Sequence, residues 1–250
     1  MDDGMAEPVR NDRCVINVIN PNTTESMTAL IAQAAQASAS PNTGIVGRTS
    51  SFGPASIEGH YDEALATIGM LKAVAAGDTE GCDAHVIACF GDPGLLAARE
   101  VTAAPVLGIA EAAMRAASFV ATHFSVVTTL SRTRVIAEHL VRNYGMERAC
   151  RKVRAVDVAV LDLDKPEANV RGLLLRECRE ALDQDGIGAI VLGCAGMADL
   201  AHDLSLELGI PVIDGVAAAV RFAEALVGLG LKTSKHGDLA FPLPKTRTPI

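Results

Sequence analysis

Two cysteines, Cys89 and Cys194, occupy the same place in two similar stretches of the sequence, residues 86–95 and 191–200. Each stretch has a short apolar run, then a small residue, the cysteine and a turn that contains glycine. We interpret each as a buried strand that delivers its cysteine to the start of a helix. Backbone N–H groups at a helix start lower a thiol pKa from about 8.5 toward neutrality. Each cysteine is therefore a candidate acid or base near neutral pH.

The similarity continues downstream, which makes it an internal repeat. A second short strand follows each cysteine at nearly the same distance, at residues 105–108 and 211–214, and an alanine-rich helix with an arginine follows both. Two related halves would then bring one thiol each to a shared site. A substrate between them could lose a carbon-bound proton to one thiolate and regain a proton from the opposite thiol. Backbone N–H groups at Gly91 and Gly196 could hold a developing oxyanion. This chemistry inverts a stereocentre and needs no cofactor.

Other polar residues follow expected strands. Asn20, Thr128 and Thr129 have amides and hydroxyls that either bind a polar ligand or cap helices. Phe52 stands in a Gly-Pro loop and either lines a pocket or anchors that loop. Asp92 and Asp199 are interpreted as helix caps rather than catalytic groups.

The histidines do not indicate a catalytic pair. None of the six follows an expected strand beside a partner, so all are interpreted as surface or helix residues: His60, His85, His123, His139, His202 and His236. A Cys-His nucleophilic enzyme is thereby disfavoured. Cys14, Cys82, Cys150 and Cys178 are interpreted as buried filler. A disulfide between Cys89 and Cys194 is a minor alternative to two reduced thiols. No CxxC or HxxxH pair supports a metal site, and no GxGxxG supports a dinucleotide enzyme.

The pattern of apolar runs predicts the elements that position these groups. Strands are expected at residues 14–19, 43–48, 86–88, 105–108, 124–127, 153–161, 191–193 and 211–214. Among the helices, one follows a capping box of Asn22 and Glu25, and others span residues 57–76 and 169–183. This alternation predicts an α/β fold with two parallel sheets of about four strands and helices on their faces. Ligands bind at the carboxyl edge of such sheets.

Bulk properties narrow the function further. The chain has 250 residues, is 49% hydrophobic and has a net charge of −8, which argues against nucleic acid and anionic membranes as partners. Residues 1–13 are polar and are expected to form a disordered tail without an export signal. No apolar run is long enough for a membrane span. A cytoplasmic location is expected.

Four motifs together resemble the aspartate/glutamate racemase superfamily, in particular its hydantoin racemase and allantoin racemase branch. They lie at residues 19–23, 53–59, 88–95 and 193–197, and the resemblance runs from about residue 15 to residue 229. It implies two pseudo-symmetric αβα (Rossmann-like) domains with the active site in the cleft between them. The first would be discontinuous, with residues 14–112 and 216–250, and the second would span residues 113–215.

The resemblance also implies roles for residues. Cys89 and Cys194 would be the acid and base, with no metal and no pyridoxal phosphate, in a homo-oligomer. The expected substrate-binding residues are Asn20, Phe52, Phe90, Gly91, Thr128, Thr129, Ala195, Gly196 and Met197. Racemases of free glutamate and aspartate have Cys-Asn-Thr at the first cysteine, whereas Phe90-Gly91 follows Cys89 here. A tighter, less polar turn suits a neutral cyclic ureide.

The expected reaction is therefore inversion at C5 of a 5-substituted hydantoin or of allantoin. Two alternatives stay open at this point: a racemase of free amino acids, and a two-lobed binding protein without catalysis.

Overall fold

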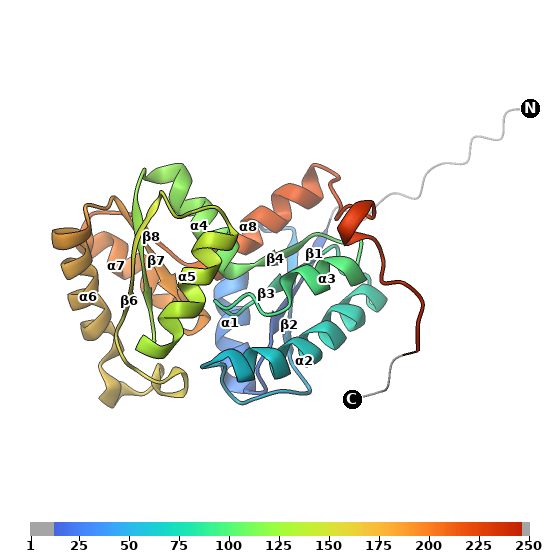
Figure 1. The fold of residues 1–250 in the computed structure, drawn as a ribbon, viewed down its shortest axis with the longest axis horizontal. Coiled ribbons are helices and arrows are strands. Elements are labelled where there is room, and N and C mark those ends of the chain that lie inside the picture. The colour runs from blue at the N-terminus through green and yellow to red at the C-terminus, as the bar shows by residue number, and fades with distance from the viewer. Residues whose placement is uncertain (1–12, 247–250) are drawn as a thin grey trace, which may run out of the picture.

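Two parallel four-stranded sheets form the frame of the molecule in the computed structural model, which describes residues 13–246 (Figure 1). The first sheet has the order β2-β1-β3-β4, with β1 (Cys14–Asn20), β2 (Thr43–Thr49), β3 (Ala84–Ile87) and β4 (Val106–Gly108). The second has the order β6-β5-β7-β8, with β5 (Phe124–Thr128), β6 (Cys150–Ala155), β7 (Ala189–Gly193) and β8 (Val212–Ile213). The predicted α/β class and the two equivalent parallel sheets are confirmed.

Helices cover both faces of each sheet. Each sheet with its covering helices is called a lobe. In the first lobe, α1 (Glu25–Ser38) and α8 (Gly215–Gly228) pack on one face of the sheet, and α2 (His60–Thr79) and α3 (Leu95–Val101) pack on the other. In the second lobe, α5 (Arg134–Asn143) lies on one face, and α6 (Val170–Asp185) and α7 (Ala201–Leu208) lie on the other. Helix α4 (Ile109–Val120) contacts elements of both lobes.

Alternating side chains in the strands explain this layering. Ile16 and Val18 point to the face under α1 and α8, whereas Ile19 points to the face under α2. The core under α8 continues through α4 to Val126 and Val191 of the second sheet. One apolar core therefore joins the lobes. The division into domains 14–112 plus 216–250 and 113–215 stays a prediction.

The topology brings equivalent strand ends together. Strands β1 and β3 are neighbours in the first sheet, and β5 and β7 are neighbours at the same positions in the second. Because Cys89 and Cys194 come just after β3 and β7, each follows a central strand at the carboxyl edge of its sheet.

Three local predictions differ from the structure. The strand expected at residues 153–161 is β6, which ends at Ala155. Asp157, two residues further on, has a positive φ of 54°, which does not fit a strand, and its carboxylate accepts hydrogen bonds from the N–H and the hydroxyl of Ser131. Helix α2 begins at His60 rather than residue 57. The capping box is absent, because α1 begins only at Glu25 and the Asn22 side chain accepts from the Thr24 N–H.

Aspartates cap the two helices that follow the last strand of each sheet. Asp214 accepts hydrogen bonds from the N–H groups of Val216 and Ala217 at the start of its own helix, α8. Asp92 does the same for α4 from a distant loop, with Ala110 and Glu111 as donors. Asp92 is thus a helix cap, as expected. The helix that it caps, α4, begins 17 residues further along the chain, at Ile109.

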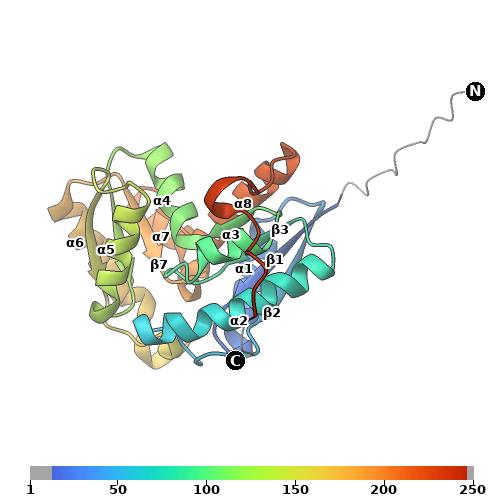
Figure 2. The same ribbon diagram turned by 45° about the vertical axis from the view of Figure 1, so that its right-hand side comes forward.

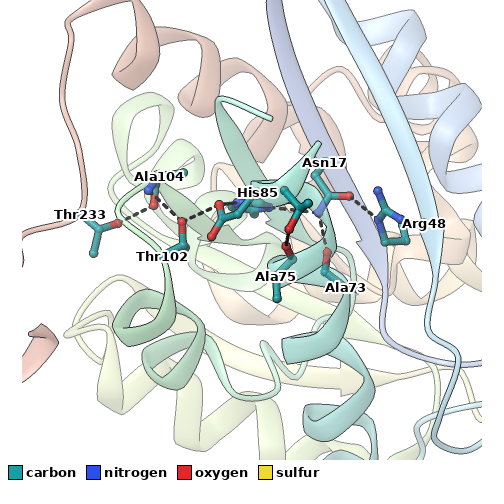
Figure 3. A network of polar contacts seen from close by, with 10 residues as sticks. Asn17, Arg48, Ala73, Ala75, His85, Thr102, Ala104 and Thr233 are labelled. Atoms are coloured by element: carbon teal, nitrogen blue, oxygen red, sulfur yellow. Dashed lines mark hydrogen bonds and ion pairs between the residues drawn. The ribbon is translucent and has the colours of Figure 1, made fainter. Parts of the chain in front are cut away.

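His85 corrects the interpretation of the histidines as surface or helix residues. It lies in β3 with no exposed surface, and burial lowers its pKa. Its ring nitrogens lie 3.0 Å from Asn17 Nδ2 and 2.9 Å from Asp78 Oδ1 (Figure 3). Thr102 donates to the same Asp78 oxygen, which extends the network toward the C-terminal segment. These polar groups stabilise the first lobe rather than the cleft.

Residues from Lys232 onward were expected to form an irregular arm. The described part has one short 3-10 helix, Gly237–Leu239, and its Lys235 ammonium donates to the carbonyl oxygens of Arg99 and Glu100. Residues 1–12, which make up nearly all of the predicted tail, lie outside the described residues. Between residues 13 and 246, no helix combines the length and the apolar character that crossing a bilayer requires.

Candidate active site

A small cavity of about 60 Å³ lies between the two lobes at the carboxyl ends of the strands. Both Cys89 and Cys194 line it. Its other lining residues are Asn22, Met27, Ile57, Glu63, Ala88, Phe90, Gly91, Thr128, Thr129, Thr133, Ile136, Ala137, Val160, Gly193 and Ala195. The two thiols of the internal repeat therefore line one cavity.

The two thiols have matching surroundings. The sulfur of Cys89 accepts a hydrogen bond from the N–H of Gly91, and the sulfur of Cys194 accepts one from the N–H of Gly196. Each bond favours the thiolate. Burial acts in the opposite direction and is the larger effect, so the pKa of Cys194 rises to about 11 and that of Cys89 rises further.

The expectation of thiol pKa values near neutrality is therefore wrong for this structure. Helix α3 begins only at Leu95, six residues beyond the first cysteine, and Cys194 precedes a short 3-10 helix, Ala195–Leu200. Neither thiol faces several free N–H groups of an α-helix. Desolvation consequently exceeds the stabilisation by one N–H group, and both cysteines carry their protons at neutral pH.

Five predicted binding residues line the cavity: Phe90, Gly91, Thr128, Thr129 and Ala195. The Thr128 hydroxyl donates to the carbonyl oxygen of Gly193 and so ties β5 to β7 beside Cys194. The Thr129 hydroxyl has no hydrogen-bond partner within residues 13–246, although the residue is buried. It is a free donor and acceptor at the site.

Four predicted binding residues do not line the cavity. The buried amide of Asn20 binds Asn22, Thr24 and Thr28 and thereby holds the loop after β1. Phe52 is 36% exposed and has the Lys72 ammonium over its ring.

The remaining two are in the second lobe. Met197 is fully buried in the core beneath α6 and α7. The N–H of Gly196 binds the sulfur of Cys194, while Gly196 itself lines a separate groove together with residues of α1 and α7.

Glu63 is the main site residue that the sequence reasoning missed. It stands in the first turn of α2, its side chain is 19% exposed, and it lines the cavity beside Cys89. A methyl group added to Gly91 would lie 2.3 Å from Glu63 Oε1, so the carboxylate reaches the turn that follows Cys89. Burial raises the pKa of Glu63, and His60 and His139 oppose that rise. The only sequence signal was an acidic first turn after a glycine-rich loop.

The segment before α2 crosses the cleft. Ile57 lines the cavity, and Glu58 Oε1 accepts a hydrogen bond of 2.9 Å from the N–H of Val160 in the second lobe. Figure 2 shows the N-terminal end of α2 reaching the second lobe. Glu58 also raises the pKa of Cys194. Residues 57–63 of the first lobe therefore flank both thiols.

Comparisons with known proteins agree with this architecture. The model of the Asp/Glu/Hydantoin racemase family matches residues 16–223. A hydantoin racemase of Pseudomonas sp. (strain NS671) is 50% identical over 231 residues, which is 92% of each chain.

Two solved structures are similar over nearly the whole chain. The allantoin racemase from Klebsiella pneumoniae has a TM-score of 0.93 and 54% identity over 94% of this chain and 96% of its own. The allantoin racemase of Pseudomonas fluorescens has a TM-score of 0.91 and 41% identity over 94% of this chain and 100% of its own. The chain belongs to the Asp/Glu/hydantoin racemase family. It is an isomerase of the racemase class.

Proposed function

We propose that the protein racemises C5 of a hydantoin ring, in a 5-substituted hydantoin or in allantoin, with Cys89 and Cys194 as the two acid/base groups. The observation that carries the proposal is that both thiols, from equivalent strand ends, line one cavity. Relatives named hydantoin racemase and allantoin racemase support the choice of substrate.

The proposed reaction has two proton transfers. One cysteine first loses its proton to water and then, as thiolate, takes the C5 proton, and the electron pair of that C–H bond passes into an enolate. The opposite thiol then gives its proton to the other face of C5, so that thiol and thiolate have exchanged places. The N–H groups of Gly91 and Gly196 stabilise the thiolate form. The free hydroxyl of Thr129 is suited to donate to the enolate oxygen.

The charge of the site favours a neutral ring over a free amino acid. None of the described lining residues is Lys or Arg, so the cavity offers no cationic side chain for an α-carboxylate. Glu63 adds a negative charge. A cytoplasmic homo-oligomer remains the expected form of the enzyme.

Proton NMR in D2O, with no added cofactor, tests the proposal. Enantiopure (S)-allantoin and L-5-benzylhydantoin are compared, and circular dichroism is followed in parallel. We expect loss of the C5 proton signal together with decay of ellipticity, faster than without enzyme, for at least one of them. No acceleration with either compound would remove the hydantoin assignment.

A further inference from the structure

Among the described residues that line the cavity, Glu63 is the only acidic one, and none is Lys or Arg. Its neighbours there are apolar side chains, two thiols, one amide and three threonine hydroxyls. A charge in such a small, largely apolar space interacts strongly with whatever binds there, because little water screens it. Glu63 is therefore the one described lining residue that presents a carboxylate to a bound substrate.

The two oxygens of this carboxylate have different surroundings. Oε2 lies 3.3 Å from His60 Nδ1, and the His60 ring stacks on His139 of the second lobe. Oε1 lies against Gly91 and has no hydrogen-bond partner within residues 13–246. One oxygen is thus held in place by the protein, and the other remains available as an acceptor beside Cys89.

We propose that Glu63 Oε1 accepts a hydrogen bond from a ring N–H of the substrate, and that its charge disfavours substrates that carry a carboxylate. This inference rests on the function proposed above. An ionised carboxylate only accepts hydrogen bonds, and a cyclic ureide presents N–H donors, so the two match. Such charge-assisted bonds are stronger than bonds between neutral groups.

The position of Glu63 points to one nitrogen in particular. The proposed reaction places C5 between the two thiols, and N1 of the ring is bonded directly to C5. A group that reaches the turn after Cys89 is therefore close to N1. The imide nitrogen N3 is one atom further from C5.

Steady-state kinetics on three enzymes tests the inference. Wild type is compared with Glu63→Gln and with the control Glu25→Gln, which removes an exposed first-turn carboxylate from α1. The substrates are 5-benzylhydantoin, its 1-methyl and 3-methyl derivatives, and 5-(carboxymethyl)hydantoin. We expect Glu63→Gln to raise KM for 5-benzylhydantoin about tenfold with a smaller change in kcat, because a bond present in both ground and transition state affects binding.

Two further readouts separate substrate recognition from a structural role. Methylation of the recognised nitrogen should reduce the kcat/KM of wild type far more than that of Glu63→Gln, by about tenfold in the ratio. The ratio of kcat/KM for 5-benzylhydantoin to kcat/KM for 5-(carboxymethyl)hydantoin should be lower in Glu63→Gln than in wild type. Glu25→Gln should match wild type in both respects. If the 3-methyl group, rather than the 1-methyl group, lowers kcat/KM more in wild type than in Glu63→Gln, the contact is supported and is assigned to N3.

Unchanged KM and an unchanged methylation penalty in a Glu63→Gln enzyme that melts like wild type would overturn the inference. Wild type alone also tests it, since equal kcat/KM for the parent and both methyl compounds would exclude any N–H contact even if the variant failed to fold. Absence of racemisation by wild type is a distinct result, which would overturn the proposed function and this inference with it.

Discussion

The phenol of Tyr144 donates a hydrogen bond of 2.6 Å to the carboxylate of Asp92, and this bond joins the second lobe to the turn that carries Cys89. Asp92 lies three residues after the cysteine, and its own N–H donates to the carbonyl oxygen of Cys89. The same carboxylate caps α4. One buried aspartate therefore fixes the turn after Cys89, the start of α4 and the opposite lobe relative to each other.

Loss of this bond should destabilise the protein. We expect Tyr144→Phe to lower the free energy of unfolding by about 1.5–3 kcal/mol, the range for a hydrogen bond to a charged group. Urea unfolding at pH 7.5 measures the change. The control is Tyr61→Phe at the only other tyrosine of the chain, which is 77% exposed. Equal effects of the two substitutions would contradict the prediction.

Asp92 should also contribute to the pH dependence of stability. Burial raises its pKa from 3.8 to about 6, so the folded state binds a proton more tightly than the unfolded state between these values. Stability should therefore fall as the pH rises from about 4 to about 6 and should change no further above that window for this group. The effect amounts to about 3 kcal/mol. The difference between the unfolding profiles of wild type and Asp92→Asn isolates it, and parallel profiles would argue against it.

The raised thiol pKa values predict slow alkylation. Because the thiolate is the nucleophile, the rate at which iodoacetamide modifies Cys194 should rise about tenfold per pH unit between pH 7 and 10. It should not level off below the pKa of about 11. Mass spectrometry of peptides measures the rate at each cysteine, with urea-unfolded protein as the control. A plateau near pH 8 in the folded protein would mean that the thiols are activated after all.

Single cysteine variants should separate the two half-reactions. We expect Cys89→Ser and Cys194→Ser to abolish racemisation, because each removes one of the two proton carriers. Each should still exchange the C5 proton for deuterium on the one enantiomer that its remaining thiol faces. Proton NMR of each pure enantiomer in D2O detects this exchange. If both variants racemised at the wild-type rate, the two-base mechanism would be excluded.

Gly77 should resist replacement by alanine even though it lies in a helix. A methyl group there would lie 2.3 Å from Asn17 Nδ2 and 2.9 Å from His85 Cε1. We expect Gly77→Ala to cost about 1–3 kcal/mol through overpacking, against a gain of about 1 kcal/mol in helix propensity. The matched control is Gly228→Ala at the end of α8, where an added methyl group would meet no atom within 4 Å. This substitution should not destabilise the protein. Thermal melting compares the two, and a more stable Gly77→Ala protein would refute the argument.

The sequence predicted the position of both thiols because the signal there is local. An apolar run that ends in a small residue, a cysteine and a glycine turn indicates a strand end, and its repetition indicates two equivalent sheets. Glu63 was missed because its approach to Gly91 depends on how α2 packs, which joins segments far apart in the chain. The near-neutral pKa values predicted for the two thiols were wrong for the same reason, since the burial that raises them is a property of the assembled lobes.

The two aspartate caps differ between the halves of the chain. Asp214 stands directly before the helix that it caps, α8. The equivalent position before α4 is Gly108, and the carboxylate of Asp92 fills the space beside it. If the halves arose by duplication, the ancestral copies were interchangeable, and the present ones are not. A chain assembled from two second halves would keep a cap on each helix but would lack the aspartate that Tyr144 holds.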